Sequence, residues 1–214
     1  MLKTSRLEVA KHSHDNSAKS LLTLEPSAGG SQDGWADDRT GLIPHNQEVM
    51  YDDEGSPPAK YEAKQLFQEA YQAQLAENYE EAIELYKRSI ATYPTAEAHT
   101  FLGWVYSFQE RYDEAIGECL EAIRVDETLG NPYNDIGSYL LSKGDAYSCV
   151  RWFKRALLAP RYDSYAFPHF NLGRVYELRH RDIEAAKHYG LALKQQPDFT
   201  QAVVALRRVQ RKLN

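Results

Sequence analysis

The chain has 214 residues, of which 43% are hydrophobic, so it is long enough to bury a core in one or two domains. Its net charge of −6 disfavours a nucleic acid as the main partner, because the phosphate backbone attracts basic surfaces. No apolar run reaches the roughly 20 residues of a transmembrane helix, and the first residues lack the apolar segment of a secretory signal. The two cysteines, Cys119 and Cys149, have no neighbours at redox or metal spacing. We therefore expect a cytoplasmic protein that is not inserted in a membrane.

Residues 1–58 differ in composition from the rest of the chain. They contain five Lys or Arg against ten Asp or Glu, and turn-forming stretches such as "PSAGGSQDGWADD" that have no helical or strand period. Such a composition is poor at offsetting the entropy lost when a chain is ordered. We therefore expect a largely disordered, acidic N-terminal arm, with a short helix near residues 17–24.

From residue 61 onward the pattern is helical and periodic. Apolar residues recur at spacings of three and four, and Gly or Pro falls at regular joints. Small residues recur at intervals of 33, 34 and 36, at Ala82, Ala115, Cys149 and Ala185. Three other features recur with the same period. Leu-Gly or Ile-Gly pairs stand at 102–103, 136–137 and 172–173, and prolines stand at Pro94, Pro160 and Pro197. Four residues after each small residue stand Tyr86, Cys119, Phe153 and Tyr189. A period of about 34 residues is typical of arrays of helix-turn-helix units.

This pattern resembles the tetratricopeptide repeat family over roughly residues 62–197. The resemblance implies an all-α fold: an α-solenoid of about four helix-turn-helix repeats and a C-terminal capping helix, within a domain spanning residues 59–214. The expected units are 63–95, 96–129, 130–163 and 166–197, and the expected cap is 198–213. In the cap, one apolar stripe should face the last unit, formed by Val203, Leu206, Val209 and Leu213.

Two departures from the family pattern stand out. The usual Trp at the fourth position of the unit is replaced by Leu66, His99, Tyr133 and His169. The joint "PRYDSYAFP" before the last unit is two residues longer than the period. We expect such departures to soften the packing of the third unit and its join to the fourth.

The resemblance also implies that the stack curves and that the first helix of each unit lines its concave side. At about 100° per residue, the second, fifth, ninth and twelfth positions share a face that a ligand can reach. The residues of this face that we expect to form a peptide-binding groove are Lys64, Phe67, Tyr71, Thr100, Trp104, Asn131, Asn134, Phe167, Phe170 and Arg174. Aromatic rings and Arg are good peptide anchors, and Asn bonds both donors and acceptors of a peptide backbone. The alternative is that these aromatic rings pack against the next unit or the arm.

The resemblance raises the question of a chaperone-tail site. Relatives that bind the acidic C-terminus of heat-shock chaperones use Lys, Arg and Asn at the fifth and ninth positions. In this chain only Asn134 and Arg174 are compatible with such a carboxylate clamp. We therefore do not expect one.

The arm could itself reach the groove. Apolar islands interrupt it at residues 21–24, 35, 42–44 and 50–51, and a flexible chain of this length spans on the order of 40 Å. We hypothesise an intramolecular contact in which part of residues 1–58 occupies the groove as a weak, tethered competitor. The alternatives are a plain linker and a recruitment motif read by another protein.

No motif of catalytic chemistry appears: the chain lacks a phosphate-binding loop, a nucleophile elbow and a dinucleotide fingerprint. We therefore expect no catalytic residues and no cofactor. His99 and His169 share a repeat position but are separated by a whole helix pair, too far to ligate one metal ion. We accordingly expect no metal site.

These observations predict a non-enzymatic adaptor or assembly factor whose aromatic groove binds a peptide or helical segment of another protein. One alternative is a chaperone-like escort that keeps an aggregation-prone client in solution. Another is a structural subunit that self-assembles through its end faces.

Overall fold

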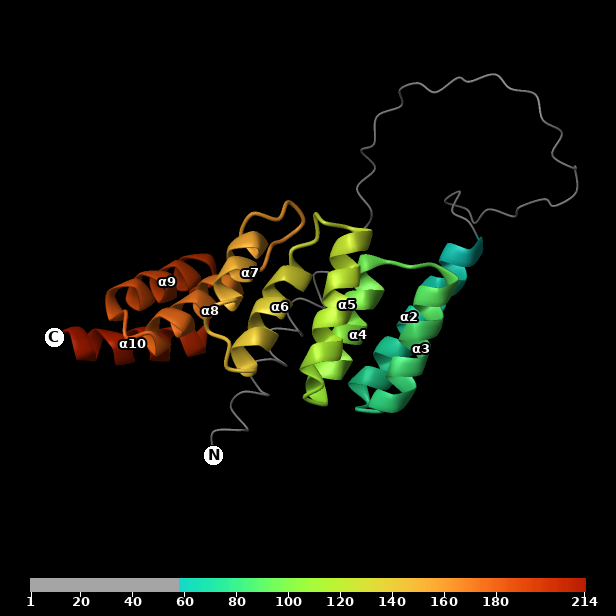
Figure 1. Cartoon of the computed structure of the whole chain (residues 1–214), viewed down its shortest axis with the longest axis horizontal. Helices are drawn as coiled ribbons and strands as arrows, with labels where there is room; N and C mark the ends of the chain where they lie inside the picture. The colour runs from blue at the N-terminus through green and yellow to red at the C-terminus, as the bar shows by residue number, and fades with distance from the viewer. Residues whose placement is uncertain (1–57) are drawn as a thin grey trace, which may run out of the picture.

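The computed structural model describes residues 58–214, and the predicted arm lies outside the described residues apart from its last position. The described part of the chain forms nine helices and no strand (Figure 1). The helices are α2 (Pro58–Leu75), α3 (Tyr79–Thr92), α4 (Ala96–Phe108), α5 (Tyr112–Val125), α6 (Asn131–Ser142), α7 (Cys149–Ala156), α8 (Ala166–Leu178), α9 (Asp182–Gln195) and α10 (Thr200–Leu213). None of these helices is long and apolar enough to cross a bilayer.

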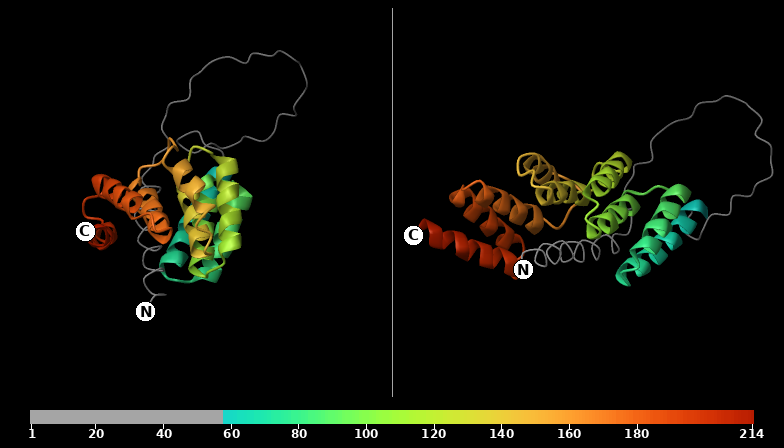
Figure 2. Two further views of the ribbon diagram at one scale, coloured as in Figure 1. Left: turned by 60° about the vertical axis from the view of Figure 1, so that its left-hand side comes forward. Right: turned by 60° about the horizontal axis from the view of Figure 1, so that its bottom comes forward.

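Consecutive helices pack in pairs, and the pairs follow one another in a single row from α2 and α3 to α10 (Figure 1). The first helices also contact one another, α2 with α4, α4 with α6 and α6 with α8. In the right-hand view of Figure 2 the row is bowed, with α4 on its inner side and α5 on its outer side. The prediction of an all-α solenoid with a terminal helix is therefore confirmed.

Each first helix ends in the same backbone motif. A residue with positive φ follows the helix in every pair, and the N–H of the residue directly after it bonds back across the turn, as in a Schellman motif. The positive-φ residues are Glu77, Glu110, Gly144 and His180, and the bonds are Asn78 to Ala73, Arg111 to Tyr106, Asp145 to Leu140 and Arg181 to Tyr176. This motif stops the first helix at a fixed place, so the second helix folds back beside it.

The repeated Leu-Gly and Ile-Gly pairs are explained by close contact between paired helices. A Cβ on Gly137 would lie 2.6 Å from the Phe153 ring, and one on Gly173 would lie 2.5 Å from the Tyr189 ring. Both rings are fully buried. In these two pairs, therefore, the glycine of the first helix contacts the aromatic ring of the second helix. The two features recur separately in the sequence but belong to one contact.

The long joint before α8 is anchored by hydrogen bonds to the loop that precedes α6, whereas the softer packing that we expect between the third and fourth units stays a prediction. Arg161 donates its backbone N–H to the carbonyl of Thr128 at 3.0 Å, and Gly130 donates its N–H to the carbonyl of Arg161 at 3.0 Å. The Arg161 guanidinium also pairs with Glu97 at 2.8 Å and with Asp126. The additional residues are therefore tied to the loop that precedes α6.

The capping helix packs through a slightly different stripe from the one predicted. Ala202, Ala205 and Val209 are buried, whereas Leu213 is 47% exposed and Val203 and Leu206 are half-buried. Small alanines let α10 approach α9 closely, so the contact line is displaced by about one residue from the stripe of large side chains. The role of α10 in covering the last pair is unchanged.

Candidate functional site

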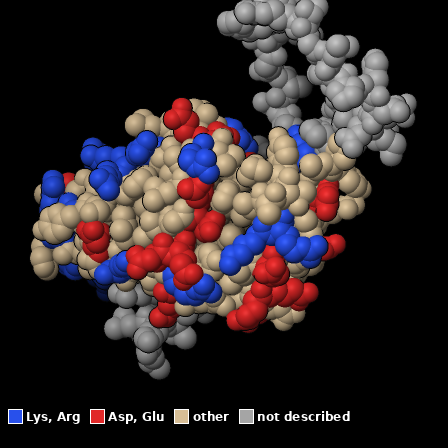
Figure 3. All heavy atoms as spheres, turned by 45° about the vertical axis from the view of Figure 1, so that its right-hand side comes forward, with Lys and Arg blue, Asp and Glu red and all other residues tan. Residues whose placement is uncertain are grey.

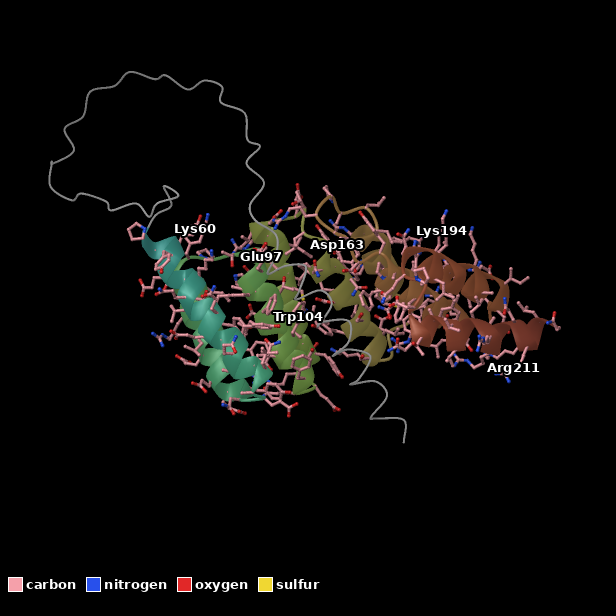
Figure 4. All side chains as sticks on the ribbon, turned by 180° about the vertical axis from the view of Figure 1, so that it is seen from behind. Lys60, Glu97, Trp104, Asp163, Lys194 and Arg211 are labelled. Carbon is pink, nitrogen blue, oxygen red and sulfur yellow. The ribbon has the colours of Figure 1, made fainter. Side chains whose placement is uncertain are left out.

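The expected groove residues lie on α2, α4, α6 and α8, the first helices of the four pairs. Figure 4 shows Trp104 on α4 in the central part of the row. Lys64 is exposed, and Phe67, Tyr71 and Arg174 are half-buried. The remaining six are buried: Thr100, Trp104, Asn131, Asn134, Phe167 and Phe170.

Three of the expected aromatic anchors meet at one ring that the sequence analysis did not single out, Phe101 on α4. Its centroid lies 4.9 Å from Phe67, 5.6 Å from Tyr71 and 4.2 Å from Trp104. The rings of Phe67 and Tyr71 approach it edge-on, the favoured geometry for aromatic pairs. These rings therefore join α2 to α4, and packing between units accounts for at least part of their presence.

Amide side chains connect α6 to α8 in the middle of the same face. Asn171 donates from Nδ2 to Asn134 Oδ1 at 3.4 Å and to Ser138 Oγ at 3.2 Å. Arg174 donates from Nη1 to Asn171 Oδ1 at 3.1 Å. We call Asn134, Ser138, Asn171 and Arg174 the amide ladder. Asn171 was missed by the sequence analysis because it stands at the sixth position, outside the four positions chosen by helical geometry.

A buried carboxylate, Asp135, adjoins the amide ladder. Trp104 donates its indole N–H to Asp135 Oδ2 at 2.6 Å, and Asn134 donates to Oδ1 at 3.4 Å. Burial raises the pKa of Asp135 to about 7, against the lowering effect of these two hydrogen bonds. The face thus contains a carboxyl group that titrates near neutral pH.

At the C-terminal end of the row, an open hollow of about 320 Å³ lies between α8, α9 and α10. It is lined by Phe170, Arg174, Tyr189, Thr200, Gln201, Val204, Ala205 and Arg208. Two of the lining residues are aromatic, Phe170 and Tyr189, with ring centroids 5.7 Å apart. Val204, at the rim, is 55% exposed. The hollow therefore combines an apolar base with two guanidinium groups.

Glu177 on α8 fixes α10 beside this hollow. Its carboxylate accepts both Nε and Nη2 of Arg208, at 2.9 and 2.7 Å, Nζ of Lys212 at 3.0 Å and the Tyr189 hydroxyl at 2.9 Å. These hydrogen bonds lower the pKa of Glu177 to about 2. Those from Arg208 have the largest effect, and those from Lys212 and Tyr189 add to it. Two cations of the capping helix are therefore engaged with the last helix pair.

No constellation typical of catalysis accompanies these groups in the residues that the structure describes. Burial raises the pKa of both thiols, that of Cys149 to about 11, so neither is a reactive thiolate at neutral pH. Within residues 58–214, no three His, Cys, Asp or Glu side chains gather closely enough to hold a metal ion.

A row of helix pairs with a period of about 34 residues defines this protein as an α-solenoid repeat protein. Residues 96–129, which span α4 and α5, match the family model of the tetratricopeptide repeat. The resemblance drawn from the sequence is therefore confirmed for that unit, and the other pairs share its fold. Proteins built of this repeat are generally scaffolds for protein interactions. No curated protein matches the chain in sequence.

Solved structures of repeat proteins share the fold. PilF of Pseudomonas aeruginosa matches with a TM-score of 0.67 and 17% identity, over 72% of this chain and 70% of PilF. YrrB, a tetratricopeptide repeat protein with an unusual peptide-binding site, matches with 0.57 and 18% identity, over 68% and 74%. The first repeat domain of Spaghetti (RPAP3), bound to the HSP90 peptide SRMEEVD, matches with 0.52 and 22% identity, over 56% and 93%. At these identities the likeness concerns the fold.

Proposed function

We propose that this protein is a non-enzymatic adaptor or assembly factor that binds a segment of another protein along the inner face of the solenoid. The observation that carries the proposal is the continuity between the hollow and the amide ladder. Arg174 belongs to both, because it lines the hollow and bonds to Asn171. A single bound segment can therefore contact the apolar hollow together with Arg174 and Ser138 at the half-buried edge of the amide ladder.

Each part of the face suits a different part of a peptide. Ser138 and Arg174, the half-buried members of the amide ladder, can bond polar groups of an extended backbone, whereas Asn134 and Asn171 are buried and position them. A hollow of about 320 Å³ is at the lower end of the range for ligand sites, so it fits one apolar side chain of a partner. The positive charge of Arg174 favours an acidic residue beside that side chain, whereas Arg208 already binds Glu177. The partner segment that fits best has an apolar residue flanked by Asp or Glu.

The surface charge supports a protein partner. In Figure 3 groups of Lys and Arg alternate with groups of Asp and Glu on the visible face, instead of forming one large basic field. Nucleic-acid recognition depends on a clustered basic surface. Two of the structural neighbours, YrrB and the Spaghetti domain, concern peptide binding, which supports the same class of function for this fold.

The proposal can be tested with two matched charge substitutions. A stoichiometric partner is first identified by native co-purification, and its affinity is then measured by calorimetry. Val204→Glu places a carboxylate at the exposed rim of the hollow, and we expect it to weaken the partner's binding at least tenfold. Val125→Glu makes the same change at a 40% exposed position at the end of α5 and should leave the affinity unchanged.

Other results would contradict the proposal. Equal affinities for the two variants would remove the hollow from the binding site. Recovery of many unfolded clients in place of one partner would favour the escort function, and a concentration-dependent mass of the isolated chain in light scattering would favour self-assembly.

The proposed contact between residues 1–58 and the groove can be examined with the same partner. If the arm competes for the groove, a chain that begins at residue 59 should bind the partner more tightly than the full chain. Equal affinities, together with unchanged amide exchange of the groove residues, would contradict this competition.

A further inference from the structure

Two histidines, His169 and His188, face each other in the fourth helix pair. The equivalent positions of the other helix pairs hold other combinations of residues. Residues 19 apart are in contact across three of the helix pairs. His99 Nδ1 lies 2.7 Å from Glu118 Oε2, and the Tyr133 and Trp152 rings lie 6.2 Å apart. In the fourth pair, His169 Nδ1 on α8 lies 3.3 Å from His188 Nδ1 on α9. The fourth pair is thus the one that opposes two imidazoles.

The distance between these two nitrogen atoms equals the distance expected between two nitrogen ligands of one tetrahedral metal ion. Zinc–imidazole bonds are about 2.0–2.1 Å long, so two such bonds at a tetrahedral angle separate the nitrogen atoms by roughly 3.3–3.4 Å. The observed distance is 3.3 Å. We propose that His169 and His188 bind one divalent transition-metal ion of the zinc or copper class through their Nδ1 atoms, which links α8 to α9.

The chemical state of the pair suits this role. A histidine must be neutral to ligate a metal. Burial lowers the pKa of both imidazoles, and that of His188, lowered further by His169, Lys187 and Lys154, is about 4. In the metal-free pair, one Nδ1–H donates to the other Nδ1. Metal binding moves that proton to Nε2 of the same ring, so the ring stays neutral and no net proton is released.

The surroundings fix one ligand and leave part of the coordination sphere open. The Tyr176 ring stacks on His188, with centroids 5.2 Å apart and an interplanar angle of 21°, and so holds that imidazole in place. Both histidines are half-buried, so solvent reaches the pair. Because no third side chain of the described residues joins them, water completes the coordination. The positive charges of Lys154 and Lys187 repel a bound metal cation. The site should therefore bind zinc more weakly than a site with four protein ligands.

The test uses the untagged full-length chain with His12→Gln and His14→Gln, which removes the two neighbouring histidines of the N-terminal segment. Zinc chloride is titrated by calorimetry and in thermal melts, and copper(II) by electron paramagnetic resonance. We expect one zinc ion per chain, a saturable rise in Tm of about 3 °C, and a copper spectrum that shows two nitrogen ligands. Either His169→Gln or His188→Gln should abolish all three, whereas His99→Gln should change none.

A gain of binding provides a second test that does not depend on removing packed side chains. In the second helix pair, Glu118→His places an imidazole opposite His99, at the same 19-residue separation. We expect this variant to bind two zinc ions per chain. Zinc binding that persists unchanged in the His169→Gln and His188→Gln variants would overturn the proposal. So would the absence of any saturable effect of zinc or copper on the parent chain, with circular dichroism confirming that all chains are folded.

Discussion

Trp104 on α4 and Asp135 on α6 are joined by a hydrogen bond of 2.6 Å from the indole N–H to the carboxyl group, which connects two consecutive first helices. Both side chains are buried. A buried indole N–H or carboxyl group that lacks a hydrogen-bond partner lowers stability by about 1–3 kcal/mol. The bond between Trp104 and Asp135 avoids this cost for both groups. The same burial makes this carboxyl group a source of pH-dependent stability.

The first prediction concerns Asp135 and pH. Its folded-state pKa of about 7 exceeds the unfolded value of about 3.9, so the folded state binds more protons between these limits. Stability contributed by this residue therefore falls as pH rises from about 4 through 7. Asp135→Asn cannot ionise, and it should be more stable than the natural chain at pH 8 by about 1–2 kcal/mol, a difference that shrinks towards pH 4. Urea unfolding at several pH values measures it.

The exposed Asp198 on the loop before α10 provides the control for this measurement. Asp198→Asn removes one negative charge at the surface, so it should lack the gain in stability that we expect of Asp135→Asn. If the profiles of Asp135→Asn and the natural chain run parallel from pH 4 to pH 8, Asp135 is not the group that titrates.

The second prediction concerns Glu177, which binds Arg208 and Lys212 of the capping helix. Its pKa is lowered to about 2, so its contribution to stability is present above about pH 4.3 and is lost as pH falls towards 2. We expect Glu177→Gln to lower the free energy of unfolding by about 2 kcal/mol at pH 7 and to detach α10 first. Chemical denaturation and amide exchange in α10 measure the two effects.

Glu184→Gln is the matched control for this substitution. Glu184 pairs with Arg181 within the first turn of α9, at a largely solvated position. Exposed ion pairs of this kind contribute little to stability because water screens them, so the control should be nearly silent. Similar losses in the two variants would show that Glu177 has no special role in holding the cap.

The third prediction concerns the left-handed residues that end the first helices. Glu110 has φ of 59° and Gly144 has φ of 90° at equivalent turns. An L-residue with a Cβ pays roughly 1–2 kcal/mol in this conformation. Glu110→Gly should therefore stabilise the protein by about 0.5–1 kcal/mol, and Gly144→Ala should destabilise it by about 1 kcal/mol, although no atom lies within 4 Å of the added Cβ. Thermal melts measure both changes.

Glu110→Ala separates the backbone effect from the loss of charge, because it removes the carboxylate but keeps the Cβ. Only the glycine variant should gain stability. An equal gain in the alanine variant would attribute the effect to the side-chain charge instead of the turn.

The repeat itself could be predicted from the sequence, because its information is local and recurs. The spacing of Gly137 to Phe153 and of Gly173 to Tyr189 is set within one helix pair, where a short turn fixes how the two helices cross. Apolar residues at three- and four-residue spacings predict the helices, and the period predicts their stacking. The all-α solenoid and its terminal helix followed from these features.

What the sequence could not determine is how one unit meets the next. The positions that meet across the stack depend on the angle and offset between successive pairs, and these are set by side-chain volumes at every interface together. For that reason helical geometry placed Phe67 and Trp104 on the inner face but did not reveal that Phe67 meets Phe101 or that Trp104 meets Asp135. It also left out Asn171, because only the packing of α8 on α6 brings this side chain within 3.4 Å of Asn134.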